Sequence, residues 1–302
     1  MTVLVTGGAG LIGMALRRHL AQAGMAAVAV DRTRFGRDDP ALELLDLADT
    51  AGLEALAHRD GVTAIAHCGA ISGPMLAKGQ PDAIVAANIQ GTANMLDLAR
   101  RLGVRRFVLC SSISVYGDTG DATLVEEMAL HPGSVYAASK VAGEALVEAY
   151  GHEYGLHGVS LRIARVYGPY RRGDCHIRTM IEAAAAGRPV RIPCDPAFVY
   201  HYVMVDDVAR AIIAALTVPA LPSRVYNVGS GEVTTMPQVV QMARAVLPGL
   251  QVDLVAGQDD VPDRQAAFDI GRIARELGVR PAWPLARGIA AYAAAVAERP
   301  DI

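Results

Sequence analysis

Tyr136 and Lys140 are the residues of this sequence whose types and spacing most clearly predict chemistry. They lie four positions apart at the start of a predicted helix, in the run Tyr136-Ala137-Ala138-Ser139-Lys140, so both side chains address the same small volume. A free phenol loses its proton only near about pH 10, and a neighbouring ammonium favours the phenolate form. The pair therefore predicts a phenol that takes a proton from a substrate hydroxyl or returns a proton to it.

A serine-rich strand end precedes this helix. The predicted strand of residues 107–111 runs into Ser112, and Ser114 follows two positions later. Ligands of open α/β sheets bind beyond the carboxyl ends of the strands, so we expect Ser111, Ser112 and Ser114 at the mouth of a site. In this arrangement Ser112 would hold the substrate hydroxyl while Tyr136 removes its proton.

A glycine-rich turn near the N-terminus predicts a cofactor that reacts alongside this proton transfer. A short buried strand precedes Gly7, Gly10 and Gly13, which have the spacing G-x-x-G-x-x-G, and the next strand ends on Asp31. Gly7 and Gly10 allow a tight turn close to a pyrophosphate, and Gly13 allows the following helix to pack closely. Asp31 can accept hydrogen bonds from a ribose. The unit predicts a dinucleotide site, and hence hydride transfer beside the proton transfer.

The second strand end also bears on which dinucleotide binds. The carboxylate of Asp31 favours the free ribose hydroxyls of NAD and repels a 2′-phosphate. Arg32 and Arg34 follow it and could pair with such a phosphate instead. We predict NAD.

The elements that position these residues alternate along the chain. Apolar runs at 3–5, 26–30, 64–67, 107–111 and 159–162 read as buried strands, and helical patterns lie between them at 48–57, 81–102 and 136–154. Strands separated by helices indicate right-handed crossovers and a parallel sheet. We therefore predict an α/β fold, a Rossmann-type doubly wound parallel sheet with a small α/β C-terminal substrate lobe. Residues 1–165 would form the core, segments at about 199–230 would return to the sheet, and 166–302 would form mainly the lobe.

Composition and charge exclude several classes of partner. The 302 residues are 52% hydrophobic and 20% charged with a net charge of −3, and no basic stripe indicates a nucleic-acid partner. No apolar run is long enough to predict a membrane span. The four cysteines, at 68, 110, 175 and 194, fit no zinc spacing and indicate a reducing compartment, so we expect no metal site and a cytoplasmic location.

Together these motifs resemble the extended short-chain dehydrogenase/reductase family, which holds nucleotide-sugar epimerases, dehydratases and related sugar dehydrogenases. The resemblance covers nearly the whole chain and includes a late motif at 226–231. It implies NAD as cofactor, catalysis by Ser112, Tyr136 and Lys140, and a homodimer formed through the helices that contain Tyr136 and Asn88. The cofactor contacts that it implies are Gly7, Gly10, Leu11, Ile12, Gly13, Asp31, Arg32, Asp46, Leu47, Cys68, Gly69, Ala70, Asn88, Ser111, Tyr136, Lys140 and Val166.

The departures from the family pattern concern the substrate. Ser112-Ile113-Ser114 stands where the dehydratases carry Thr-Asp-Glu, so dehydration is not expected. Arg165 replaces a frequent Asn, Tyr200 stands where an Arg often grips the diphosphate, and Asp259-Asp260 lies near a later diphosphate Arg. A diphosphate needs cationic partners, so these differences argue against a nucleotide sugar.

We therefore interpret the chain as an NAD-dependent oxidoreductase that acts on a secondary alcohol or ketone of a carbohydrate-like small molecule, with net dehydrogenation of a sugar or sugar acid preferred. A nucleotide-sugar epimerase is one alternative, and a non-catalytic NAD-binding sensor is another. The candidate substrate contacts are Ser72, Ser112, Ser114, Arg165 and Tyr200.

Overall fold

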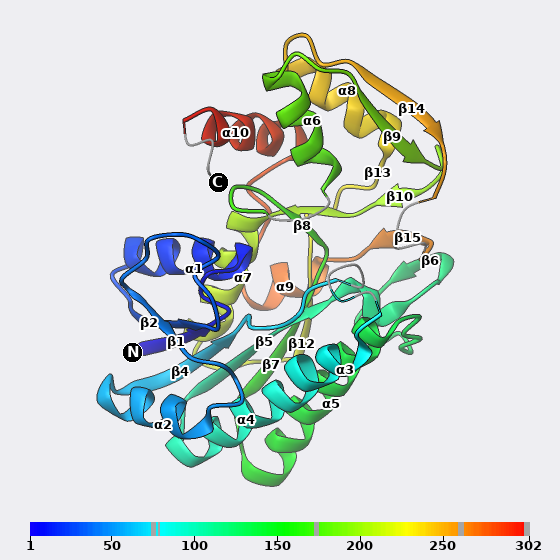
Figure 1. Ribbon diagram of the computed structural model, residues 1–302. Coiled ribbons are helices and arrows are strands. Elements are labelled where there is room, and N and C mark those ends of the chain that lie inside the picture. The colour runs from blue at the N-terminus through cyan, green and yellow to red at the C-terminus, as the bar shows by residue number, and fades with distance from the viewer. Residues whose placement is uncertain (74–76, 78, 172–174, 259–262, 299–302) are drawn as a thin grey trace.

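A parallel sheet of seven strands forms the centre of the protein (Figure 1). The computed structural model describes residues 1–73, 77, 79–171, 175–258 and 263–298. The strand order is β12-β7-β5-β4-β1-β2-β3, so the order reverses between β1 and β4, where such sheets bind dinucleotides. The strands are β1 Thr2–Thr6, β2 Ala26–Asp31, β3 Leu42–Leu44, β4 Val62–His67, β5 Arg106–Ser112, β7 Gly158–Ile163 and β12 Val225–Val228.

Helices cover both faces of this sheet, as the alternation of patterns predicts. Helices α1 (Leu11–Gln22) and α7 (Val205–Thr217) lie on one face. Helices α2 (Thr50–Arg59), α4 (Gly91–Leu102) and α5 (Val135–Tyr154) lie on the other. Because both faces are buried, the central strands are almost continuously apolar, and the predicted Rossmann-type fold is confirmed.

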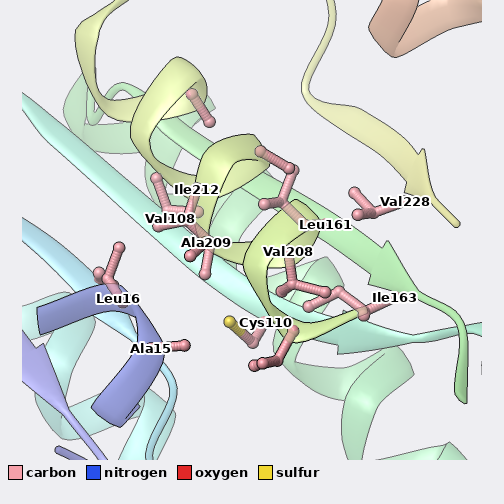
Figure 2. Packing of buried hydrophobic residues seen from close by; sticks show 14 of the residues in the cluster. Ala15, Leu16, Val108, Cys110, Leu161, Ile163, Val208, Ala209, Ile212 and Val228 are labelled. Carbon is pink, nitrogen blue, oxygen red and sulfur yellow. The ribbon is translucent and has the colours of Figure 1, made fainter. Parts of the chain in front are cut away.

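The core beneath α7 shows how the later chain returns to the sheet (Figure 2). Val208 and Ile212 of α7 are fully buried against Val108 of β5 and Leu161 of β7. Burying an aliphatic side chain of this size contributes about 1.5–3 kcal/mol. This packing holds α7 against β5 and β7.

A second apolar cluster forms the lobe above the sheet in Figure 1. Its helices are α6 (His176–Ala185), α8 (Met236–Val246) and α10 (Leu285–Glu298). The lobe contains two short two-stranded pairs, β9 (Val190–Cys194) with β14 (Val252–Ala256) and β10 (Val199–Tyr200) with β13 (Thr234–Thr235). A third pair, β8 (Arg165–Tyr167) with β11 (Tyr202–Met204), joins the lobe to the core, because its residues pack in both clusters.

The structure adds elements that the sequence pattern did not predict. The predicted helix 81–102 consists of α3 (Pro81–Ile84), a π-helical turn (Val85–Gln90) and α4. A 3-10 turn (Ile113–Tyr116) follows β5, and β6 (Gly120–Leu124) pairs with β15 (Gln265–Phe268) before α9 (Gly271–Glu276). In the described part of the chain, no helix is both long and apolar enough to span a membrane.

Candidate active site

The glycine-rich turn between β1 and α1 forms a cradle that admits no side chain at two positions. Gly7 has φ +65°, and a Cβ there would lie 2.8 Å from the backbone of Cys68 and Gly69. A Cβ on Gly13 would lie 2.1 Å from the carbonyl oxygen of Gly7. Gly13 therefore allows the turn to pack closely against the first turn of α1, as the motif predicts, and Gly7 allows it to pack against the end of β4, which the sequence did not predict.

Two arginines hold the carbonyl side of this turn. Arg17 donates to the carbonyl of Gly8 at 3.2 Å, and Arg37 donates to the carbonyl of Ala9 at 2.8 Å. Arg17 is itself fixed by an ion pair with Asp39 at 2.6 Å. Gly10 is the N-cap of α1 and makes no side-chain hydrogen bond to the helix. The backbone N–H groups at the start of α1 can therefore bind an anion. Sequence reasoning missed both arginines, because they lie outside the motif.

Asp31 lies at the end of β2, directly beside the cradle. The N–H of Ala9 donates to the Asp31 carboxylate at 3.1 Å. Burial raises the pKa of this carboxyl, and the backbone N–H groups around it oppose that shift. The carboxylate is thus held where a ribose would meet it, and a dinucleotide fits the cradle and this acid together.

The cofactor preference follows from what surrounds Asp31. Arg34 donates to the carbonyls of Asp39 and Leu42, at 3.1 and 3.2 Å, so two of its N–H groups are engaged by the backbone of the protein itself. We expect NAD to bind at least about tenfold more tightly than NADP, because the carboxylate repels the extra phosphate. Calorimetric titration with each cofactor measures this ratio. An Asp31→Asn variant should show a smaller preference for NAD over NADP, because it lacks the repelling charge. Tighter binding of NADP than of NAD by the wild type would contradict the prediction.

The other predicted cofactor contacts line the carboxyl ends of neighbouring strands. Cys68, Gly69 and Ala70 follow β4, and the N–H of Gly69 donates to the Thr6 hydroxyl at 3.0 Å. Asp46 and Leu47 follow β3, whose Leu44 pairs with Asp31. Val166 lies in β8. Leu11 and Ile12 begin α1, and Arg32 is exposed just after β2.

Two predicted cofactor contacts have their side chains engaged by the protein itself. The Asn88 carboxamide accepts from the N–H of Ile71 and donates to the Ile71 carbonyl and to Ser139 Oγ, at 2.8, 3.0 and 3.0 Å. The Ser111 hydroxyl donates to Glu144 at 2.5 Å. In this structure both side chains position neighbouring segments.

The three predicted catalytic residues meet at the end of β5. Helix α5 begins at Val135 because Ser134 Oγ accepts the N–H of Ala137 at 3.1 Å, which places Tyr136 in the first turn. The Lys140 ammonium donates to the carbonyl of Cys110 in β5 at 2.9 Å and lies 5.8 Å from the centroid of the Tyr136 ring. Ser112, the last residue of β5, is 8% exposed, as is Tyr136. A phenol, an ammonium and a hydroxyl thus lie in one buried corner, between the end of β5 and the first turns of α5.

A buried histidine connects the cradle to the helix side of this corner. His67 Nδ1 lies 2.8 Å from Thr6 Oγ1, and Nε2 lies 3.1 Å from Thr92 Oγ1. Thr92 in turn donates to the Asn88 carbonyl at 2.6 Å. Burial, with a smaller effect of the Lys140 charge, lowers the pKa of His67 to about 3. The imidazole is therefore neutral and links β1, β4 and α4.

This neutral histidine predicts a loss of stability in acid. Between about pH 6.5 and pH 3 the unfolded chain protonates His67 and the folded chain does not, so the unfolded state binds more protons and stability falls as the pH falls. We expect this residue alone to remove up to about 1.4 kcal/mol of unfolding free energy per pH unit in that window. Urea titrations across the pH range measure it. His67→Gln should flatten the slope, whereas exposed His152→Gln should not, and equal slopes in all three proteins would contradict the prediction.

A buried ion pair lies beside the corner that holds Tyr136 and Lys140. Glu144 lies one turn beyond Lys140 on α5, and its carboxylate accepts from Arg162 of β7 at 2.7 Å, with both side chains under 8% exposed. The same carboxylate accepts from Ser111, the neighbour of Ser112. The pair therefore ties α5 to β5 and β7. Sequence reasoning missed it, although Tyr136, Lys140 and Glu144 follow each other at steps of four along one helix face.

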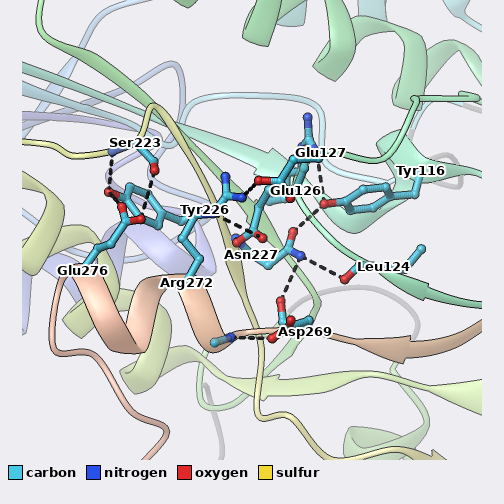
Figure 3. Close-up of polar contacts among 12 residues, drawn as sticks. Tyr116, Leu124, Glu126, Glu127, Ser223, Tyr226, Asn227, Asp269, Arg272 and Glu276 are labelled. Carbon is cyan, nitrogen blue, oxygen red and sulfur yellow. Dashed lines mark hydrogen bonds and ion pairs between the residues drawn. The ribbon is translucent and has the colours of Figure 1, made fainter.

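The network continues to β12 through the late motif (Figure 3). Arg162 donates to the Tyr116 hydroxyl at 2.9 Å, and that hydroxyl donates to Asn227 at 2.7 Å. Asn227 also donates to the carbonyls of Leu124 and Asp269, at 3.3 and 2.9 Å. Asn227 of the late motif thus joins β12 to the segments after β5 and to the residues just before α9. The sequence alone did not reveal this role of the motif.

The predicted substrate contacts fall into two groups. Ser114 stands beside Ser112, whose Oγ donates to Ser114 Oγ at 3.2 Å, and Ser72 is exposed beyond β4. Tyr200, by contrast, is 2% exposed and stacks on Tyr202 at 5.7 Å between centroids. Its ring lies 5.1 Å from the guanidinium carbon of Arg165, so in this structure Tyr200 supports Arg165.

The described residues contain no group of three or more His, Cys, Asp or Glu side chains arranged to hold a metal ion. Asp259 and Asp260, which the sequence places near a diphosphate-binding position, lie outside the residues that the structure describes.

Solved structures share this architecture over the whole chain. A UDP-glucose 4-epimerase from Thermotoga maritima, solved with UDP-glucose, has a TM-score of 0.90 and 26% identity and covers 100% of both chains. A UDP-glucose 4-epimerase from Thermus thermophilus, solved with NAD, has a TM-score of 0.87 and 29% identity over 97% of this chain and 98% of its own.

Sequence relatives cover the chain equally well. A UDP-glucose 4-epimerase of Mycolicibacterium smegmatis is 33% identical over 316 residues, 96% of each chain. A dTDP-glucose 4,6-dehydratase of Streptomyces griseus is 31% identical over 309 residues, 97% of this chain and 93% of its own. The model of the NAD dependent epimerase/dehydratase family matches residues 3–229. The predicted enzyme class and the predicted cofactor NAD are thereby confirmed, and the chain belongs to the NAD dependent epimerase/dehydratase family.

Proposed function

We propose that the protein is an NAD-dependent epimerase of a nucleotide sugar. The observation that carries this proposal is the corner formed by Ser112, Tyr136 and Lys140 beside the glycine cradle. Bound NAD supplies the acceptor and donor of a hydride at a sugar carbon. Tyr136 removes the proton of the hydroxyl on that carbon and later returns it, and the Lys140 ammonium favours the phenolate. Ser112 holds the oxygen in both directions.

The strand end favours epimerisation over dehydration. Elimination of water needs an acid and a base next to the reacting sugar, and Ile113 and Ser114 provide neither. The carboxylates that support this end of the sheet, Glu144 and Glu126, are paired with Arg162 and Arg272. A keto sugar formed here would therefore be reduced again, and reduction from the opposite face inverts the carbon.

The relatives favour this epimerase alternative over net dehydrogenation of a free sugar, because those named above act, by their names, on nucleotide sugars. A dehydrogenase of a small anionic sugar is the second candidate, and one observation favours it. The position of a diphosphate arginine holds buried Tyr200, and the cation beside it comes from Arg165.

One assay distinguishes these candidates. The purified protein is incubated with UDP-glucose, UDP-glucuronate, dTDP-glucose and a panel of free sugars and sugar acids, with product analysis by NMR and NADH followed by absorbance. We expect an epimerised nucleotide sugar without net NADH, and none with Tyr136→Phe. Net NADH from a free sugar acid would establish the dehydrogenase, a 4-keto-6-deoxy product would establish a dehydratase, and NAD binding without turnover would indicate a sensor. Each of these three results contradicts the epimerase.

The division of labour in the chain and its assembly are part of the proposal. Residues 1–165, with the segments that return at about 199–230, would bind NAD, and most of 166–302 would bind the sugar.

Exposed Val135 and Tyr154 of α5 and Val85 of the preceding π-helical turn support a homodimer through these helices. The four free cysteines are consistent with the expected cytoplasmic location.

A further inference from the structure

Cys68 and Cys110 lie side by side at the carboxyl ends of β4 and β5. In the parallel ladder His67 pairs with Leu109, so these cysteines are the next neighbours across the two strands. Their sulfur atoms are 3.5 Å apart, and the Cys110 thiol donates to the Cys68 thiol. Both pack on the face covered by α1 and α7, where Figure 2 shows the Cys110 sulfur. The chemistry proposed above uses neither thiol.

This pair has the spacing that a disulfide requires. Neighbouring strands are about 4.8 Å apart, and disulfides join Cα atoms that are roughly 4.4–6.8 Å apart. The sulfur atoms need to approach from 3.5 Å to about 2 Å, which side-chain rotation and a small strand movement provide.

The backbone carbonyls of both cysteines contact residues of the candidate active site. The Cys110 carbonyl accepts the Lys140 ammonium at 2.9 Å. The Cys68 carbonyl lies 2.8 Å from where a Cβ of Gly7 would be, so the cradle has no spare room beside it. A movement of either strand end therefore displaces the catalytic lysine or the turn that faces the cofactor.

We propose that Cys68 and Cys110 form a reversible disulfide that weakens NAD binding. The oxidant is a peroxide. Cys68 is the less buried of the two residues. Its sulfur attacks a peroxide oxygen, and the thiol proton leaves with the departing hydroxide as water, which gives a sulfenic acid. The Cys110 sulfur then attacks the Cys68 sulfur, and the Cys110 proton leaves with the sulfenic hydroxide as a second water. The two thiols lose two electrons and two protons, and hydrogen peroxide takes them up as two molecules of water.

The thiol–thiol hydrogen bond and burial raise the pKa of the Cys68 thiol. The Cys68 thiol is therefore protonated at neutral pH and reacts slowly with peroxide, so the pair stays reduced at low peroxide concentrations.

The test treats the NAD-loaded protein with graded hydrogen peroxide, alkylates the remaining thiols and maps the peptides by mass spectrometry. NAD affinity is measured by calorimetry on parallel samples that are freed of NAD after the treatment. We expect a Cys68–Cys110 cross-linked peptide and an NAD affinity lowered by about tenfold, or about 1.4 kcal/mol, with dithiothreitol restoring both. Neither readout needs a substrate, so the outcome is independent of the proposed epimerase activity.

Two variants control the test, each compared with its own untreated sample. Cys110→Ser should yield no cross-link. At high peroxide its Cys68 should be oxidised beyond the sulfenic acid, and dithiothreitol should then not return it to the thiol. Cys194→Ser, altered in the lobe, should behave like the wild type. Oxidation of Cys68 without a cross-link to Cys110, or a cross-link that leaves NAD affinity unchanged, would overturn the proposal.

Discussion

Tyr136→Phe is expected to lower turnover by about 10²–10⁴-fold while leaving NAD affinity nearly unchanged. The substitution removes the oxygen that carries the proton and keeps the ring, which is 8% exposed and packed at the start of α5. Lys140→Met should lower turnover too, because the phenolate loses its neighbouring ammonium, and should also free the Cys110 carbonyl. Steady-state kinetics on the substrate found by the panel assay, with NAD titration, measure both effects.

A tyrosine on the same helix provides the matched control. Tyr154 closes α5 and is 49% exposed, so Tyr154→Phe should leave turnover within about twofold of the wild type. Turnover of Tyr136→Phe close to that of the wild type would exclude the phenol as the proton carrier and with it the proposed mechanism.

The second large effect concerns the ion pair behind the site. Glu144→Ala or Arg162→Ala should lower the free energy of unfolding by about 3–5 kcal/mol, because each leaves an opposite charge buried without its partner. The two side chains are 7% and 6% exposed, so water does not replace the missing group. Urea unfolding followed by circular dichroism measures the change.

An exposed pair and a double variant serve as controls. Asp253 and Arg191 also form an ion pair, but their side chains are 63% and 75% exposed, and Asp253→Ala should cost about 0–1 kcal/mol. The double replacement Glu144→Ala with Arg162→Ala should cost less than the sum of the two single changes, because it removes both charges. Additive losses would show that the pair is not coupled as the structure indicates.

The local motifs were readable because their function depends on residues close in sequence. A glycine spacing between a strand and a helix specifies one βαβ unit, and the four-residue step from Tyr136 to Lys140 specifies one helix face. Most residues of the buried parallel strands are apolar, so the alternation of patterns predicted the sheet as well. The family resemblance added the order of the remaining segments.

The departures at the substrate positions were less decisive than they seemed from the sequence. The missing diphosphate arginines predicted a small free sugar, yet relatives that match more than nine-tenths of the chain are enzymes of nucleotide sugars. A change of residue type does not reveal whether a cation arrives from elsewhere. In this lobe Tyr200 stacks on Tyr202, and the guanidinium carbon of Arg165 lies 5.1 Å from the centroid of the Tyr200 ring.

The sequence by itself thus determined the class of fold through the alternation of strand and helix patterns. It predicted the glycine cradle and the step from Tyr136 to Lys140, because both rest on short-range spacing. Only the tertiary structure decided which groups hold them: Arg17 and Arg37 on the turn, and Glu144 with Arg162 behind the serines. It also placed Cys68 beside Cys110, which lie 42 positions apart along the chain. These contacts join elements brought together by strand order, and strand order depends on how the whole chain buries its apolar faces.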